Sequence, residues 1–135
     1  MTSSVFKPDV LKGKCAFITG GATGICYGIA QAYIEHGCKV TIASRKIANI
    51  TKAVEQLKKD TKSEDVYGFA CDIRKPEDVE KAITGAVDKM GKIDILINGA
   101  AGNFLAAFES LSINAFRTVL EIDTLGTFIV SKIAY

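Results

Sequence analysis

The feature that most constrains the fold of this chain is an apolar run that ends in a cluster of glycines. Residues 15–26 read Cys-Ala-Phe-Ile-Thr-Gly-Gly-Ala-Thr-Gly-Ile-Cys, and helical periodicity follows them. This order predicts a strand, a tight turn and a helix. Gly20 can adopt the dihedral angles of the turn, and Gly24 lacks the Cβ atom that would keep a pyrophosphate from the free N–H groups at the helix start. A dinucleotide site is therefore expected, although Cys26 replaces the last glycine of the usual templates.

A second apolar run, residues 39–44, ends in Ser44, Arg45 and Lys46. An NAD site usually has a carboxylate here, about 20 residues after the glycines, which accepts a hydrogen bond from the ribose 2′-hydroxyl. This chain has a hydroxyl and two cations instead, and a guanidinium binds a phosphate through charge-assisted contacts. We therefore expect NADPH as the cofactor, with Ser44 and Arg45 in its site. The alternative is that the cations only place solvated charge at a sheet edge.

The periodicity of the apolar residues alternates between that of strands and that of helices. Strands are predicted at 15–19, 39–44, 66–71 and 93–98, and helices at 25–36, 47–59 and 76–90. A further helix is predicted over 114–135, with Ser112 as its N-cap. Alternation of this kind is typical of βαβ units, so we expect an α/β fold with a doubly wound parallel sheet.

The composition excludes several classes of protein. With 135 residues, 48% of them hydrophobic, the chain suits one domain with a sizeable core. Its 17 basic and 15 acidic residues are spread along the sequence, so no nucleic-acid partner is expected. No apolar run approaches the roughly 20 residues of a membrane-spanning helix, and no signal-peptide core is present, so we expect a protein on the reducing side of membranes. The four cysteines lack C-x-x-C spacing and are predicted to be core residues rather than metal ligands.

The sequence stops at Tyr135, inside the last predicted helix. A doubly wound nucleotide-binding fold is built from two βαβαβ halves, and the predicted elements supply only the first half and its crossing helix. We therefore expect residues 1–135 to form one NADP-binding domain that is incomplete at its C-terminus.

Several segments resemble the short-chain dehydrogenase/reductase family, and together they cover nearly the whole chain. They are the glycine turn at 19–26, the step Cys71-Asp72-Ile73, the segment 93–101 and the segment 123–128. Within this family, the runs 6–9, 42–45, 100–104 and 121–124 are most similar to the peroxisomal 2,4-dienoyl-CoA reductases. The resemblance implies a Rossmann-type fold and NADPH-dependent reduction of 2,4-dienoyl-CoA esters in the oxidation of unsaturated fatty acids.

The resemblance also implies roles for residues around the pyrophosphate. Gly20 and Gly24 take the glycine positions of the turn, and Gly21, Thr23 and Ile25 surround the pyrophosphate. The thiol of Cys26 stands where a glycine usually allows close packing of helix and strand, and a small buried thiol is tolerable there.

Further roles concern the nucleosides of the cofactor. The resemblance implies that Asp72 accepts a hydrogen bond from the adenine amino group and that Ile73 packs on the adenine ring. The resemblance also implies that Asn98 and Ala100 belong to the cofactor site: Asn98 would stabilise the end of its strand, and Ala100 would be one of the small residues that pass under the nicotinamide ribose. Alternatively, Asp72 only begins a loop.

Three residues are implied at the reacting end of the site. Asn103 would bond an acyl carbonyl and Phe104 would line an apolar pocket at the substrate entrance, or Asn103 is only a turn residue. Asp123 stands where most members of the family have an active-site asparagine. An apolar pocket would favour its protonated form, so the resemblance implies a catalytic role in proton delivery. Alternatively, Asp123 is only a polar residue that pairs with polar groups at a kink of its own helix.

The resemblance finally implies a dienoyl-CoA substrate, a homo-oligomer that is a tetramer or a dimer, and a peroxisomal location, or else a cytoplasmic one. The last residues, 132–135, do not form a peroxisomal Ser-Lys-Leu ending. One alternative is another carbonyl or enoyl reductase of the family, which would have an asparagine at position 123. The other alternative is a nucleotide-binding or oligomerisation fragment without turnover.

Overall fold

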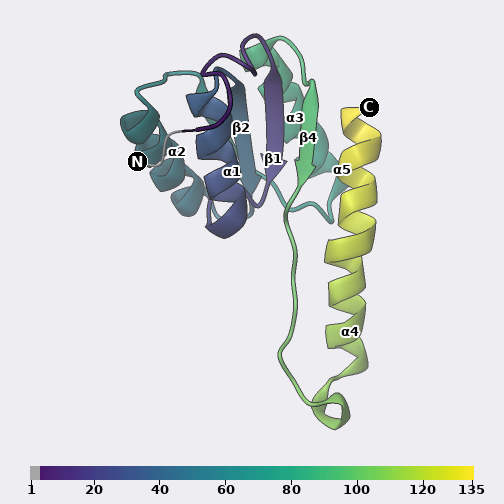
Figure 1. Ribbon diagram of the computed structural model, residues 1–135. Helices are drawn as coiled ribbons and strands as arrows, with labels where there is room; N and C mark the ends of the chain where they lie inside the picture. Colours follow the sequence, from purple (N-terminus) through teal and green to yellow (C-terminus); the bar gives the residue numbers. More distant parts are fainter. Residues whose placement is uncertain (1–3) are drawn as a thin grey trace.

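The computed structural model describes residues 4–135 and confirms the predicted α/β fold. Four parallel strands form one sheet in the order β3-β2-β1-β4 (Figure 1). The strands are β1 (Cys15–Thr19), β2 (Lys39–Ser44), β3 (Val66–Ala70) and β4 (Ile95–Asn98). The helices are α1 (Gly24–Glu35), α2 (Ile47–Thr61), α3 (Pro76–Met90), α4 (Ile113–Leu120) and α5 (Thr127–Ala134). A 3₁₀ turn, η1 (Phe108–Ser110), precedes α4, and a π-helical segment, η2 (Glu121–Gly126), joins α4 to α5.

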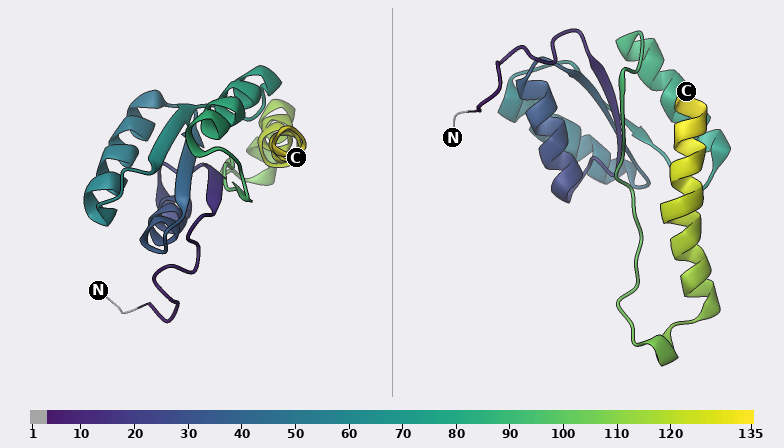
Figure 2. Two further views of the ribbon diagram at one scale, coloured as in Figure 1. Left: turned by 90° about the horizontal axis from the view of Figure 1, so that it is seen from above. Right: turned by 45° about the vertical axis from the view of Figure 1, so that its right-hand side comes forward.

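Two apolar clusters, one on each face of the sheet, hold the layers together. Because side chains alternate along a strand, Phe17 of β1 packs with α3 and α5, whereas Ala16 and Ile18 pack with α1 and α2. Figure 2 shows the sheet between these two helical layers. Strand β1 is buried along its whole length, as expected of a strand in the middle of a parallel sheet.

The predicted bounds of β1, β2 and α3 are confirmed, and the others differ by one or two residues. Strand β4 begins at Ile95 rather than at residue 93, because the carboxylate of Asp94 accepts the hydrogen bond of the Cys15 N–H group at 2.9 Å and pairs with Lys92 at 3.0 Å. Strand β3 ends one residue early, and α1 is displaced by one residue toward the N-terminus. Helix α2 runs two residues further and ends at Thr61, because the next residue, Lys62, has a left-handed φ of 56°.

The helix predicted over 114–135 is present, but a π-helical turn interrupts it. Ser112 is the N-cap as predicted, since its Oγ accepts a hydrogen bond from the Ala115 N–H group at 3.0 Å. Gly126, at the end of η2, lies against Ile73, and a Cβ atom there would come within 2.6 Å of the Ile73 Cδ1 atom. The missing side chain therefore lets the π-helical turn approach the segment that follows β3.

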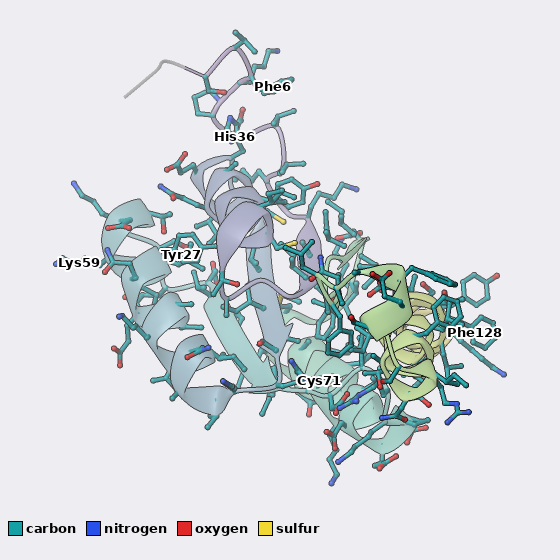
Figure 3. All side chains as sticks on the ribbon, turned by 90° about the horizontal axis from the view of Figure 1, so that it is seen from below. Phe6, Tyr27, His36, Lys59, Cys71 and Phe128 are labelled. Atoms are coloured by element: carbon teal, nitrogen blue, oxygen red, sulfur yellow. The ribbon has the colours of Figure 1, made fainter. Side chains whose placement is uncertain are left out.

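Two segments lie outside the layered body. The chain between β4 and α4, together with α4 itself, extends away from the sheet (Figure 2). At the N-terminal side, Phe6 packs edge-on against His36, with ring centroids 6.1 Å apart (Figure 3). The Ser4 hydroxyl also forms a hydrogen bond with His36 Nε2 at 2.8 Å. No helix in residues 4–135 has the length and apolar character that crossing a membrane requires.

The strand register brings the carboxyl ends of the four strands to one edge of the sheet. Thr19, the last residue of β1, lies opposite Ala43 of β2 and Asn98 of β4, and Ser44 lies opposite Ala70 of β3. The segments that follow these ends are the glycine turn, the step after Ser44, the step after β3 and the loop after β4. The fold therefore gathers the predicted site at this edge.

Candidate functional site

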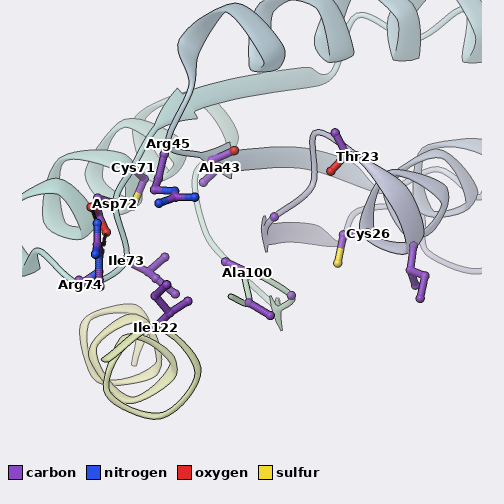
Figure 4. Close-up of a pocket in the computed structure, with 15 residues that line it drawn as sticks. Thr23, Cys26, Ala43, Arg45, Cys71, Asp72, Ile73, Arg74, Ala100 and Ile122 are labelled. Carbon is purple, nitrogen blue, oxygen red and sulfur yellow. Dashed lines mark hydrogen bonds and ion pairs between the residues drawn. The ribbon is translucent and has the colours of Figure 1, made fainter. Parts of the chain in front are cut away.

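A cavity of about 420 Å³ opens at the edge where the strands end (Figure 4). Ligands of open α/β sheets bind in the crevice outside the carboxyl ends of the strands, where the strand order reverses, and this volume lies in the range of small-molecule sites. The lining residues come from the glycine turn, the ends of β2 and β3, the loop after β4, and η2. They are Gly20, Thr23, Ile25, Cys26, Ala43, Ser44, Arg45, Cys71, Asp72, Ile73, Arg74, Gly99, Ala100, Ala101 and Ile122.

The first glycine of the turn is required by a close approach of two backbones. Gly20 has a φ of +69°, and a Cβ atom there would lie 2.7 Å from the Gly99 carbonyl oxygen. Its N–H group donates to the Ala43 carbonyl at 2.8 Å, which ties the turn to the end of β2. Gly21 instead faces the sheet, where a Cβ atom would meet Ile42 Cγ2 at 2.6 Å. Gly20 thus shapes the cavity wall, whereas Gly21 permits packing behind it.

Gly24 begins α1 and leaves space above the helix N-terminus. Its φ is +59°, and no described heavy atom lies within 4 Å of the position of a Cβ atom. Thr23, the N-cap residue, makes no side-chain capping bond within the described part of the chain. The first N–H groups of α1 therefore remain available to an anion, which the helix dipole also favours. This open cradle fits the pyrophosphate of a dinucleotide.

Cys26 and Gly99 fit together across the cavity floor. A Cβ atom on Gly99 would overlap the Cys26 Sγ atom and would lie 2.9 Å from the Thr19 carbonyl oxygen. The Thr19 hydroxyl accepts hydrogen bonds from the Gly99 and Ala100 N–H groups at 3.0 and 3.1 Å. The thiol that replaces the expected glycine in α1 thus occupies the space that the glycine after β4 leaves open.

The end of the cavity formed by β2 and β3 is charged. Arg74 holds Asp72 with two side-chain bonds, Nε to Oδ1 at 2.9 Å and Nη2 to Oδ2 at 2.6 Å. These bonds lower the pKa of the Asp72 carboxyl group, and the positive charge of Arg45 acts in the same direction. Nearby, burial raises the pKa of the Cys71 thiol to about 11, so this thiol is neutral at physiological pH.

The residues predicted at the reacting end lie outside the cavity lining. Asn98, at the end of β4, does not line the cavity either, and its side chain donates to the Ser131 hydroxyl at 3.0 Å. Asn103 and Phe104 are exposed in the loop after β4. Asp123 is exposed too, and its Oδ1 accepts a hydrogen bond from the Gly102 N–H group at 2.9 Å. The apolar surroundings expected for Asp123 are not found among residues 4–135: η2 places Ile122 in the cavity wall and Gly126 against Ile73, whereas Asp123 is exposed beside the loop that carries Gly102.

Most of the predicted cofactor residues lie together at the cavity. Those that line it are Gly20, Thr23, Ile25, Ser44, Arg45, Asp72, Ile73 and Ala100. Sequence reasoning missed Arg74, although its position two residues after Asp72 was a usable signal: a carboxylate that begins a loop is within reach of a cation two residues on. It also missed Ile122, whose place in the wall depends on the π-helical turn.

Comparison with known proteins agrees with this geometry. Residues 14–135 match the family model described as short chain dehydrogenase, and the chain belongs to the short-chain dehydrogenase family. Among curated proteins, it is 46% identical over 97% of its length to peroxisomal 2,4-dienoyl-CoA reductase [(3E)-enoyl-CoA-producing] of Danio rerio. The protein of the same name from Rattus norvegicus is 47% identical, and the yeast protein SPS19 is 43% identical. The chain spans 43–46% of the length of these three relatives.

Solved structures share the fold. A 3-ketoacyl-(acyl-carrier-protein) reductase from Brucella melitensis complexed with NADH superposes with a TM-score of 0.82 at 28% identity, over 90% of this chain and 49% of that one. The citronellol catabolism dehydrogenase AtuB of Pseudomonas aeruginosa gives a TM-score of 0.87 at 30% identity, over 97% of this chain and 53% of that one. The described sheet and helices therefore correspond to about half of such an enzyme.

Proposed function

We propose that this chain carries the NADPH site of a reductase that acts on 2,4-dienoyl-CoA esters. The observation that carries the proposal is Arg45, a cation at the end of β2 that lines the cavity beside the glycine turn. An enzyme that uses NADH usually has a carboxylate there. The substrate class is supported by the names of the relatives from fish, rat and yeast, all of which are 2,4-dienoyl-CoA reductases.

Each part of the cofactor has a partner in this proposal. The N–H groups at the start of α1, next to Gly24, bind the pyrophosphate, and Ser44 and Arg45 bind the 2′-phosphate. Asp72 accepts a hydrogen bond from the adenine amino group, and Ile73 packs on the adenine ring. Small residues around Ala100 leave room for the nicotinamide ribose. When bound, NADPH supplies the hydride.

The proposed reaction reduces the conjugated system at its two ends. A hydride adds to the carbon of the conjugated system that is furthest from the thioester. The electron pairs of the two double bonds shift toward the thioester, and a proton adds to the carbon beside it. One double bond then remains between carbons 3 and 4, which matches the product named for the relatives. Asp123, fixed to the Gly102 N–H group through Oδ1, is proposed to hold the proton or a water molecule that delivers it.

The substrate half of the proposal rests on the loop that carries Asn103 and Phe104. This loop is tied to η2 by the bond between Gly102 and Asp123, and Asn103 and Phe104 directly follow Gly102 in the sequence. In the proposal, the Asn103 amide binds the thioester carbonyl and the Phe104 ring packs on the acyl chain. The peroxisomal names of the relatives support the same compartment for this protein.

A panel of substrates tests the proposal in the full-length protein. The oxidation of NADPH is followed with a 2,4-dienoyl-CoA, a 2-enoyl-CoA and a 3-ketoacyl-CoA of equal chain length. We expect rapid turnover of the dienoyl-CoA only, with formation of the 3-enoyl-CoA. Turnover of the ketoacyl-CoA alone would instead assign a carbonyl reductase, and NADPH binding without any turnover would assign a nucleotide-binding module.

A further inference from the structure

Two of the three arginines in the chain lie at the same end of the cavity. Arg45 follows β2 and Arg74 follows β3, and Asp72 lies beside Arg74 (Figure 4). The third, Arg117, is exposed on α4 and does not line the cavity. The site therefore combines two cations with one carboxylate where the proposed NADPH would place its adenosine 2′-phosphate.

The carboxylate is held in one orientation by Arg74. Both oxygens are engaged, Oδ1 by Nε at 2.9 Å and Oδ2 by Nη2 at 2.6 Å, which is the two-pronged geometry that a guanidinium and a carboxylate prefer. The side chain of Asp72 is 14% exposed and that of Arg74 is 33% exposed. Since the guanidinium lowers the pKa of Asp72, the carboxyl group is ionised at neutral pH.

An ionised carboxylate is unfavourable next to a phosphate. Asp72 and Arg45 line the same cavity, so an anion held by Arg45 would be close to the negative charge of Asp72. Like charges at short range oppose each other, and partial burial strengthens the effect. The site needs a positive charge that cancels the Asp72 carboxylate while leaving it able to accept a hydrogen bond from adenine.

We infer that Arg74 is a specificity-determining residue that neutralises and orients Asp72, so that one cavity accepts both the adenine amino group and the 2′-phosphate. This inference rests on the proposed NADPH site. It assigns the two arginines different tasks: Arg45 binds the phosphate directly, whereas Arg74 acts through Asp72. NADH also presents its adenine to Asp72, but it lacks the 2′-phosphate, and the Arg74 backbone N–H group still holds Asp72 Oδ1 when the side chain is changed. NADH is therefore expected to depend on the Arg74 charge much less than NADPH does.

The turn that carries these residues does not depend on the Arg74 side chain. The Arg74 N–H group donates to Asp72 Oδ1 at 3.1 Å, and the Lys75 N–H group donates to the Asp72 carbonyl at 2.9 Å. Both bonds involve backbone donors and remain in an Arg74→Gln variant. The substitution thus removes the charge and keeps the turn.

The test measures the dissociation constants of NADPH and NADH for the full-length protein and its variants. Arg74→Gln is expected to raise the dissociation constant of NADPH about tenfold. A neighbouring charge commonly shifts a pKa by about one unit, and the same interaction energy corresponds to a tenfold change in a binding constant. The affinity for NADH should change less than about twofold, because NADH places no 2′-phosphate beside the Asp72 carboxylate. Adding Asp72→Asn to Arg74→Gln should restore most of the NADPH affinity, and Arg117→Gln, the matched control, should change neither cofactor.

Two results would overturn the inference while leaving the proposed function intact. One is an equal loss of NADPH and NADH in Arg74→Gln, which would mark Arg74 as structural. The other is a double variant as weak for NADPH as Arg74→Gln itself. If Arg74→Gln unfolds, Arg74→Lys, which keeps a positive charge, must retain the preference for NADPH, or the inference is wrong. An unsubstituted protein without any preference for NADPH would contradict the proposed function as well.

Discussion

At the scale of single residues, the cofactor site depends on where side chains are absent. Gly20 and Gly24 both have positive φ, but only Gly24 faces open space where a ligand can approach. At position 20 the Gly99 backbone leaves no room for a side chain. The same glycine pattern therefore serves two purposes, one of shape and one of binding.

Substitution of Gly24 tests the binding purpose. In Gly24→Val, a branched side chain fills the space above the α1 N-terminus, so NADPH affinity should fall by more than tenfold, or about 1.4 kcal/mol. The left-handed φ also costs about 1–2 kcal/mol of stability, so a lower melting temperature is expected without loss of the fold. Gly28→Val is the matched control, because Gly28 lies on the same helix with open space and no positive φ. Equal NADPH titrations for both variants would show that Gly24 has only a structural role.

The pairing of Cys26 with Gly99 makes a second prediction. Gly99→Ala forces a methyl group onto the Cys26 thiol, and overpacking of this kind costs about 1–3 kcal/mol. Adding Cys26→Gly should recover part of the lost melting temperature. The rest should persist, because the new Cβ atom still lies 2.9 Å from the Thr19 carbonyl oxygen. Additive losses in the double variant would contradict the pairing.

At the scale of elements, the sequence predicted the sheet better than the site. Buried β-branched runs separate strands from helices without reference to tertiary contacts, and the bounds of β1, β2 and α3 followed from them. The start of β4 did not, because the carboxylate of Asp94 replaces a backbone acceptor for Cys15, 79 positions away in the sequence. The exposure of Asp123 and the place of Ile122 were missed for a related reason, since a π-helical turn inside a long amphipathic pattern leaves no periodic signal.

The segment η2 carries the proposed catalytic residue, and substitution there tests its role. Asp123→Ala in the full-length protein should lower turnover by about 10²–10⁴-fold, the usual contribution of a positioned general acid or base, with NADPH affinity within a few-fold. Asp123→Asn keeps an oxygen that can accept from the Gly102 N–H group but removes the acid. If proton delivery is the role of Asp123, the asparagine variant should be as slow as the alanine variant. Near-normal turnover in the asparagine variant would leave Asp123 only the task of holding the loop.

At the scale of the whole molecule, the layered body buries its apolar side chains, whereas the extended arm leaves many of its own exposed. The sheet and its flanking helices bury two apolar clusters, whereas the arm, residues 99–120, exposes large apolar side chains. They include Leu105, Phe108, Ile113 and Phe116. Several large apolar side chains exposed on one segment are typical of a contact with another surface.

The 135-residue chain should therefore self-associate or bind an apolar dye. Replacing Leu105 and Phe108 together by serine should reduce dye fluorescence and self-association, because both side chains are exposed. The melting temperature should stay within a few degrees, since neither residue belongs to a buried cluster. A monomer that binds no dye would contradict this view of the arm.

In the proposed site, the residues at the strand ends select the cofactor. The deciding measurement compares the dissociation constants of NADPH and NADH for the unsubstituted full-length protein and for Arg45→Ala. Lys46→Ala is the control variant, because Lys46 is a neighbouring cation that does not line the cavity. We predict a preference for NADPH that Arg45→Ala reduces by about 1.5–3 kcal/mol, the range for hydrogen bonds to charged groups, while NADH affinity stays nearly constant. Equal losses for NADPH and NADH, or no preference in the unsubstituted protein, would contradict the account.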